Sequence, residues 1–387
     1  MGNELKTNTK KRVAYLDMTK GLGIFMITYG HITRLGNPVD EWMSLFKVSI
    51  FYVVAGYMIA MSGKKDKTTW GAYSLHVLKG LGIPYITLGL AAAIVRPMTM
   101  FLKGRDWMYE LKLRLFEIIS LHGVSALWFL PTLFVGQVVY FAILRIKKKE
   151  VRFVVMGFTW IWPIVLGLLT QKQMGIFEGT LSKRNFMLVT YPFLAIAKGL
   201  VAVWFLQAGY LGYEALRWAM AKLQGVKPEE IPVSLLADQG SKLSYLKFAL
   251  GLGLSLFTIW FTKYNPHIDF NGMTIGEGLS SYAFFLGGIT GSYGALLVFE
   301  FLEHYFKLEL FTYFGKNSLI LMGTQRGLMI INLAVAGWKS VVKLESGVCG
   351  RYYLECLAIL SLVLLMTYGI IEFIQGKAPW IIGKKKK

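Results

Sequence analysis

Residues 13–32 read VAYLDMTKGLGIFMITYGHI, and the interpretation of the whole chain depends on this stretch. It has the length of a membrane-crossing helix, about 20 residues, yet it contains Asp17, Lys20, Thr28 and His31. On a helix that turns about 100° per residue, Lys20 and His31 lie within roughly 20° of each other, and Asp17 lies about 40° to the other side of His31. The segment is therefore predicted to be a transmembrane helix with one polar stripe.

An ionisable side chain inside a membrane span is costly, so the stripe is interpreted as a functional site. The alternative is a helix-packing seam with a snorkelling lysine, although a seam needs the glycines and not the histidine. Along the helix axis Lys20 and His31 are about 16 Å apart, and Asp17 and His31 about 21 Å. Any carboxylate that orients His31 must therefore come from another helix. The spacing suits a long substrate with a charged head and a reactive tail.

The composition indicates an integral membrane protein. Of the 387 residues, 55% are hydrophobic and only 17% are charged, and several apolar runs exceed the length needed to cross a bilayer. The net charge of +20 is assigned to basic loops on the cytoplasmic side, and no nucleic-acid partner is expected. Cys349 and Cys356 form no metal or redox motif, and no metal site is predicted.

The hydropathy pattern predicts an all-α, polytopic fold with ten spans. Lys and Arg are about twice as frequent on one set of loops as on the other, which predicts cytoplasmic N- and C-termini. The predicted spans are 13–32, 42–62, 81–98, 125–144, 153–170, 186–207, 244–262, 279–300, 317–337 and 353–374.

The chain is predicted to be a single membrane domain, 1–387. Residues 1–12 form a basic cytoplasmic N-terminus, 208–243 a cytoplasmic loop with a short helix, and 375–387 a basic cytoplasmic tail. The loop 99–124 mixes charged and apolar residues at helical spacing, which predicts a helix along the membrane surface that is able to cover an outward-facing site.

Six short stretches, in this order, carry a resemblance to a known family. They are LDMTKGLGIFMITYGH (16–31), FYVVAGYMIA (51–60), LKGLGIPYI (78–86), LWFLPTLFVGQ (127–137), FGKNSLILMGTQ (314–325) and PWIIGKK (379–385). Together they resemble the acyltransferase-3 family of ten-helix membrane acyltransferases, over essentially the whole chain. The resemblance implies transfer of an acyl group, usually acetyl, from a cytoplasmic acyl-CoA to glycans on the far side of the membrane.

The family's motif of a basic residue, ten residues and a histidine falls on Lys20 and His31, although arginine is more common than lysine at the first position. The lysine keeps the charge and lacks the planar fork of arginine, which makes bidentate phosphate binding less favourable. Many members have histidines where this chain has Ala126 and Gln325; His122 lies four residues before Ala126. The hydrolase-like domain fused to some members is not expected here.

His31 is the predicted catalytic residue, either as the general base that takes a proton from a sugar hydroxyl or as a transient carrier of the acyl group. The alternative is a histidine satisfied by a neighbouring helix. The sequence favours catalysis over this alternative but does not separate the general base from the acyl carrier.

Four cations are the predicted acyl-CoA-binding residues, because buried cations need an anionic partner and CoA phosphates supply one. They are Lys20, Lys79, Lys198 and Arg326. Asp17 is expected to pair with Lys20 one helical turn away. For each cation the alternative is snorkelling or a structural ion pair.

The remaining candidates are supporting residues. Trp128 is either a platform for a sugar ring or an interfacial anchor, and Asn317 either offers helix-start amides to an anion or caps the helix. Gln325 ends the fifth motif, and Lys47 and Arg96 are charged residues without an assigned role.

The sequence therefore predicts an O-acyltransferase of the bacterial cytoplasmic membrane with acetyl-CoA as co-substrate and no tightly bound cofactor. The acceptor would be a hydroxyl of a cell-envelope glycan or glycolipid. A multi-span transporter or glycolipid flippase is the competing class, and a member that only binds CoA is a third possibility.

Overall fold

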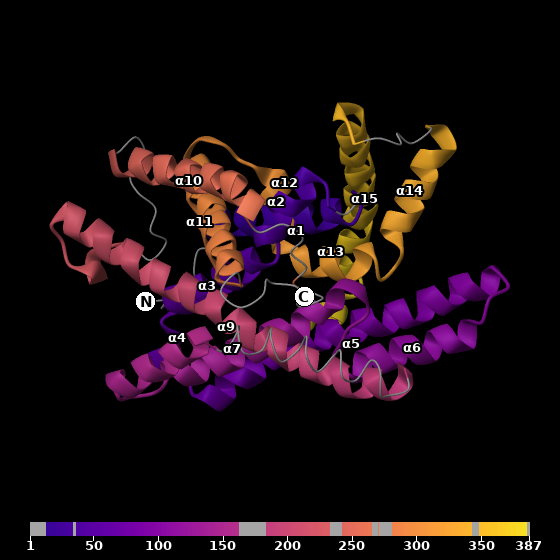
Figure 1. Cartoon of the computed structure of the whole chain (residues 1–387), viewed down its shortest axis with the longest axis horizontal. Helices are drawn as coiled ribbons and strands as arrows, with labels where there is room; N and C mark the ends of the chain where they lie inside the picture. The colour runs from indigo at the N-terminus through magenta and orange to yellow at the C-terminus, as the bar shows by residue number, and fades with distance from the viewer. Residues whose placement is uncertain are drawn as a thin grey trace, which may run out of the picture.

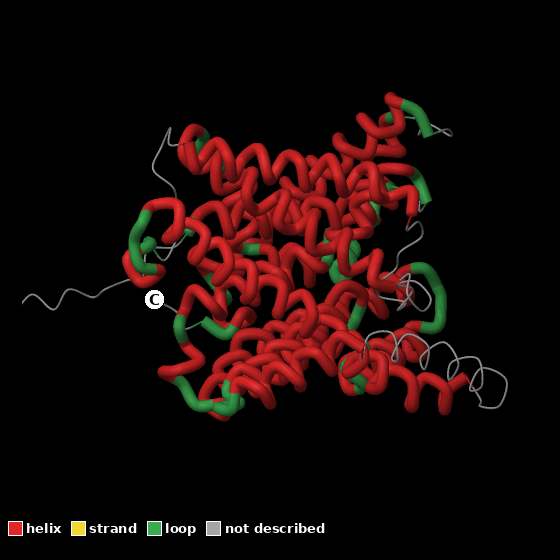
Figure 2. The backbone as a smooth tube through the Cα atoms, turned by 60° about the vertical axis from the view of Figure 1, so that its left-hand side comes forward, coloured by secondary structure: helices red, strands yellow, loops and turns green. Residues whose placement is uncertain are grey.

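The computed structural model describes residues 13–33, 36–161, 183–232, 242–264, 270, 281–342 and 348–384. Within these ranges the regular structure is helical and contains no strand (Figure 2). The elements are α1 (Ala14–Gly30), α2 (Pro38–Phe46), α3 (Ser49–Ser62), α4 (Lys64–Lys67), α5 (Trp70–Leu102), α6 (Trp107–Ile119), η1 (Ser125–Trp128), α7 (Phe129–Leu144), α9 (Lys183–Gln224), η2 (Pro228–Glu230), α10 (Lys242–Phe261), η3 (Thr262–Tyr264), α11 (Ser281–Tyr305), α12 (Glu309–Lys316), α13 (Ser318–Gln325), α14 (Ile330–Val341), α15 (Gly350–Gly376) and η5 (Pro379–Ile382).

The predicted all-α polytopic fold is confirmed. Among the described residues, 7 helices are long and apolar enough to cross a membrane, and the bent pair α13 and α14 makes up to 8. Helix α1 has 17 residues, just short of the usual crossing length. The span predicted at 153–170 is helical over its described part, to residue 161, and the rest lies outside the described residues.

One predicted loop boundary is wrong, and two predicted spans are interrupted. The span 317–337 is broken into α13 and α14, which meet at 66°. The span 42–62 is present within the candidate crossing Pro38–Ser62, in which α2 and α3 separate at residues 47–48. The connection predicted at 208–243 begins 17 residues later than predicted, because α9 continues to Gln224.

Helix α9 has 42 residues, which at about 1.5 Å per residue corresponds to about 63 Å, twice the hydrocarbon thickness of a bilayer. Polar residues in its last turns mark the end of the apolar span but do not end the helix, because these residues are good helix formers. In Figure 1 α9 runs obliquely across the whole molecule.

The helix predicted within 99–124 is present as α6. It lies antiparallel to the second half of α5, as the hairpin at the right of Figure 1 shows. The hydroxyl of Tyr85 on α5 donates to the carbonyl of Ile118 on α6 at 2.8 Å, which fixes the two helices to each other. Helix α6 is therefore packed along α5.

Helix α1 occupies the centre of the bundle. Every residue in it except Ala14, Lys20 and Leu22 is buried. A Cβ atom at Gly315 would lie 1.8 Å from the carbonyl oxygen of Asp17, and one at Gly21 would lie 2.2 Å from that of Phe311. The backbones of α1 and α12 therefore touch, which only glycine at these two positions permits.

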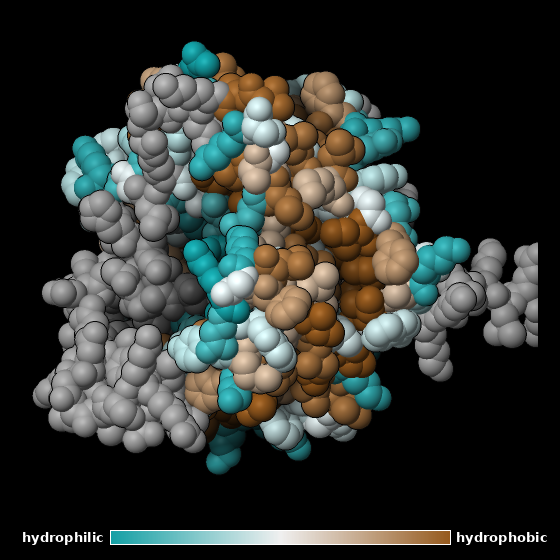
Figure 3. All heavy atoms as spheres, turned by 90° about the vertical axis from the view of Figure 1, so that its right-hand side faces the viewer, coloured by the Kyte–Doolittle hydropathy of each residue, from teal (hydrophilic) through white to brown (hydrophobic). Residues whose placement is uncertain are grey.

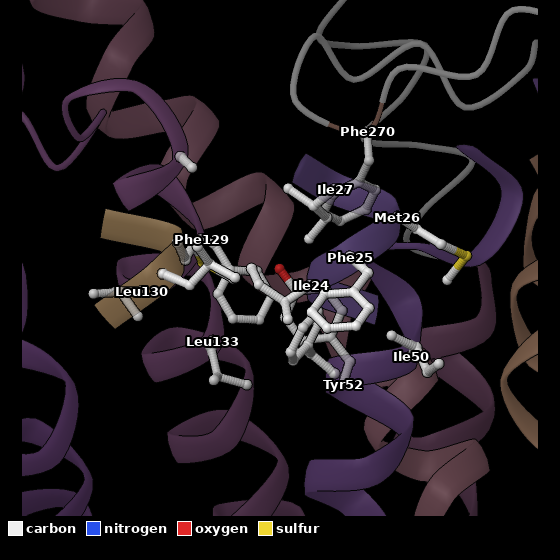
Figure 4. Close-up of a cluster of buried hydrophobic side chains, with 14 of the residues drawn as sticks. Ile24, Phe25, Met26, Ile27, Ile50, Tyr52, Phe129, Leu130, Leu133 and Phe270 are labelled. Atoms are coloured by element: carbon white, nitrogen blue, oxygen red, sulfur yellow. The ribbon is translucent and has the colours of Figure 1, made fainter. Parts of the chain in front are cut away.

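The apolar core surrounds α1 from several sides. Figure 4 shows side chains of α1, α3 and α7 gathered between the helices, with Phe270 lying over Ile27. On the outside, the face in Figure 3 carries a continuous apolar surface bordered by hydrophilic side chains, as expected of a protein surrounded by lipid.

We expect Gly315→Ala to lower the thermal unfolding temperature of the protein in detergent micelles, because the new methyl group meets backbone that cannot rotate away. Overpacking of this kind costs about 1–3 kcal/mol or more. Gly369→Ala on α15 is the matched control, because a Cβ there meets nothing within 4 Å. Equal unfolding temperatures for the two variants would show that the α1–α12 contact is not needed for stability.

Candidate functional site

His31 follows directly after α1 and faces a cavity of about 320 Å³. Its side chain is exposed to this cavity, and no side-chain hydrogen bond joins its ring to another described residue. The cavity is open to one side and is walled by residues of α1, α2, η1, α7 and α13 together with Phe270. The imidazole is therefore accessible to a small ligand.

The same cavity is also lined by Asp40, Ser44 and Lys47, for which the sequence indicated no functional role. The ammonium of Lys47 donates to Asp40 Oδ1 at 3.1 Å and to Ser44 Oγ at 2.8 Å. Asp40 is buried, so this ion pair also compensates its charge. In the sequence, only their spacing of four and three residues indicates that these three side chains lie on one face of a helix.

Asn37 and Pro38 start α2 and thereby place these polar groups. The Asn37 side chain accepts from the backbone amides of Val39 and Asp40 at 3.1 Å, and proline occupies the first helical position. Both features are typical of helix N-termini. Asp40, in the first turn of α2, lies against Gly30 at the end of α1, next to His31.

Arg326 enters the cavity from the break between α13 and α14. Met329, at the start of α14, has a left-handed φ of 59°, and the chain changes direction here. The backbone carbonyl of Arg326 accepts a hydrogen bond of 3.1 Å from Nη2 of Arg96 on α5. Arg326 and Lys47 are both close enough to act electrostatically on the His31 ring.

Trp128 also lines the His31 cavity, and Lys198 packs behind it. The Lys198 ammonium lies 4.7 Å from the centroid of the Trp128 ring, in a cation–π contact. Lys198 is buried. It also acts electrostatically on His122, whose ring stacks on Tyr191 at 3.7 Å. Burial lowers the pKa of His122 to about 4, with Lys198 and Arg114 adding to the effect.

Lys20 faces a second cavity, of about 150 Å³. The expected ion pair with Asp17 is present, with 2.7 Å between Lys20 Nζ and Asp17 Oδ1. Asp17 is buried, whereas the Lys20 side chain is 19% exposed and reaches the cavity. The carboxylate thus holds the ammonium at the cavity wall.

The Lys20 and His31 cavities are neighbours on one side of α1. Phe129 from α7 and Met322 from α13 line both of them, so these two side chains form the common wall. Phe129 is held by ring contacts with Phe51 and Tyr52 on α3, at 5.5 and 5.0 Å between centroids. Lys20 and His31 thus line neighbouring cavities, as the predicted polar stripe requires.

A third cavity, of about 330 Å³, adjoins the Lys20 cavity, with which it shares Ala55, Met58 and Leu81. Lys64 and His76 line it, near the α3–α5 connection. Lys79 is exposed on α5 and lies outside its wall.

Asn317 and Gln325 lie at the two ends of α13. The Asn317 amide nitrogen donates to the Tyr313 carbonyl at 2.9 Å, and its oxygen accepts from Gln375 on α15. Its side chain makes no cap to α13. Gln325 is fully buried, and neither of its amide atoms has a hydrogen-bond partner among the described residues.

The structure thus brings His31, Trp128 and Arg326 together in one cavity and places Lys20 with Asp17 in the next. It does not bring the four predicted CoA-binding cations together: Lys20, Lys79, Lys198 and Arg326 occupy separate places. Their individual roles stay predictions. In the part of the chain that the structure describes, no three His, Cys, Asp or Glu side chains are grouped to hold a metal ion.

One comparison with known proteins identifies the chain's family. The model of the acyltransferase-3 family, described as an acyltransferase domain, matches residues 13–331 and so includes both cavities that flank α1. No curated protein and no solved structure matches the chain. The match covers most of the sequence, and the chain belongs to the acyltransferase-3 family of membrane acyltransferases.

Proposed function

We propose that the protein transfers an acyl group, acetyl in the simplest case, from acyl-CoA to a hydroxyl of a cell-envelope glycan or glycolipid. The bacterial cytoplasmic membrane is its proposed location. The observation that carries this proposal is the pair of adjacent cavities on one flank of α1, one with a cation and the other with an exposed imidazole. A transferase needs adjacent binding sites for its donor and its acceptor, with the reacting group between them.

The acyl-CoA is proposed to enter from the cytoplasmic side through the cavity lined by Lys64 and His76, with Lys79 on the surface nearby. Lys20 then binds a CoA phosphate, because its ammonium, held in place by Asp17, is the charged group that lines this otherwise apolar cavity. From there the pantetheine arm extends past Phe129 and Met322, so that the thioester reaches His31. The axial distance of about 16 Å along α1 is available for this arm.

In the proposed reaction the acceptor hydroxyl lies between His31 and the thioester carbonyl. The neutral imidazole takes the hydroxyl proton while the oxygen forms a bond to the carbonyl carbon. The carbon–sulfur bond then breaks, and the imidazolium returns its proton to the CoA thiolate. In a second version the imidazole attacks the thioester first and carries the acyl group to the acceptor. Trp128 offers a face on which a sugar ring can stack.

A transporter is the second candidate, because the break between α13 and α14 beside a cavity is a feature that transporters use at substrate sites. The experiments below separate the two functions, since a transporter would not consume acyl-CoA.

We expect His31→Ala to lower acyl transfer from labelled acetyl-CoA by about 10²–10⁴-fold, the usual contribution of a general base. His304→Ala, at the far end of α11, is the control and is expected to retain activity. Mass spectrometry of the protein after incubation with acetyl-CoA alone separates the two versions, because only the carrier version leaves acetyl on His31. Near-normal turnover by purified His31→Ala would remove His31 from the mechanism.

We expect Lys20→Gln to weaken the binding of CoA, because the substitution removes the one ammonium that faces the donor cavity. Titration calorimetry with CoA measures the effect, and a rise of about tenfold in the dissociation constant corresponds to one lost charge-assisted hydrogen bond. Lys339→Gln, on the exposed side of α14, is the control. Unchanged CoA affinity in Lys20→Gln would assign Lys20 a structural role as the partner of Asp17.

A further inference from the structure

The His31 cavity carries a positive charge that its own side chains leave uncompensated. Asp40 and Lys47 neutralise each other at 3.1 Å. Arg326, the other charged residue in the wall, has no carboxylate partner among the described residues. A cavity with an unpaired guanidinium at its edge attracts anions.

A second guanidinium lies beside the backbone of Arg326. Nη2 of Arg96 on α5 donates to the Arg326 carbonyl, so the end of the Arg96 side chain reaches the α13–α14 break, where the Arg326 side chain begins. The Nε atom of Arg96 is buried and has no hydrogen-bond partner in the described structure. A buried donor without a partner is destabilising, and a bound acceptor removes this destabilisation.

Helix α6 carries carboxylates that compensate the charge of Arg96, so Arg96 alone does not form an anion site. Glu110 and Glu117 face Arg96 but are already bridged by Arg114, at 2.9 and 2.5 Å. Their two negative charges thus equal the positive charges of Arg114 and Arg96, and neither carboxylate is paired with Arg326. The excess positive charge is that of Arg326, which is exposed and lines the same cavity as His31.

From this geometry we propose that the acceptor is an anionic molecule, whose phosphate or carboxylate group is bound by Arg326 and Arg96 while its hydroxyl faces His31. The planar fork of arginine fits both anions in a bidentate manner. This inference rests on the proposed function, and it assigns Arg326 to the acceptor rather than to the donor. It excludes neutral sugars as good acceptors.

The test uses three small probes on the purified full-length protein in detergent, at matched ionic strength: glucose 1-phosphate, glucuronate and glucose. We expect calorimetry to detect binding of one or both anionic sugars and none of glucose at the same concentration. The stronger of the two identifies phosphate or carboxylate as the preferred group. Binding of glucose as tight as that of the anions, or no binding of either anion, would overturn the proposal.

Substitutions locate the anion. Arg326→Gln and Arg96→Gln are each expected to weaken binding of the preferred anionic sugar about tenfold or more, and Arg326→Lys less, because it keeps the charge and loses the fork. Arg351→Gln is the control, since Arg351 is 67% exposed on α15 and pairs only with Glu355. If Arg326→Gln binds the anionic sugar as tightly as the Arg351→Gln control does, the proposed site is refuted.

CoA is the remaining anion to separate. Titration of CoA into Arg326→Gln is expected to give the wild-type affinity, because the donor cations lie elsewhere. If this variant no longer binds CoA but still binds the anionic sugar, Arg326 belongs to the donor site and the inference is wrong. All of these measurements read binding without acyl transfer, so they succeed or fail independently of the role of His31 in the reaction.

Discussion

The contact between the backbones of α1 and α12 is the constraint on which the site depends. Glycines at 21 and 315 let the two helices touch, so that α1 is fixed in depth and rotation. Because the carbonyl of Asp17 is itself part of this contact, the ion pair with Lys20 is held at the same point. The rotation of α1 in turn decides that Lys20 and His31 both face α7 and α13.

The burial of α1 explains why its polar groups are compatible with a membrane protein. A charged residue facing lipid would be expelled, but the charges on α1 face cavities inside the bundle. The lipid is met by other helices, among them α10, whose most apolar window is only 22% buried. The contact with lipid is thus made by peripheral helices, and Figure 3 shows apolar side chains gathered on one outer face of the molecule.

Much of the fold and part of the site follow from the sequence alone. Helical class and spans follow from hydropathy, and the shared flank of Lys20 and His31 follows from their spacing of eleven residues. The break in 317–337 does not, because MGTQRGLM contains no proline and the positive φ at the break falls on Met329, not on a glycine. Asp40 and Lys47 could not be assigned either, since nothing in a single helix indicates which neighbour it will face. The expectation that Arg326 and Lys198 lie close to Lys20 failed for the same reason. The depth of a residue along a span gives neither the rotation of its helix nor the position of that helix in the bundle.

The wall that Phe129 and Met322 form between the two cavities has a consequence for the living membrane. A protein with hollows on both sides risks becoming a leak for protons and other ions, and each charge that passes dissipates about 2.3 kcal/mol per 100 mV of potential. A ring and a thioether offer hydrated ions no ligands, so an apolar barrier of this kind stays impermeable to them. The arm of the proposed acyl-CoA donor is thin and uncharged along most of its length, and the barrier need only yield to it. Under the proposed function, acyl groups are thus transferred across the membrane without discharge of the electrochemical gradient.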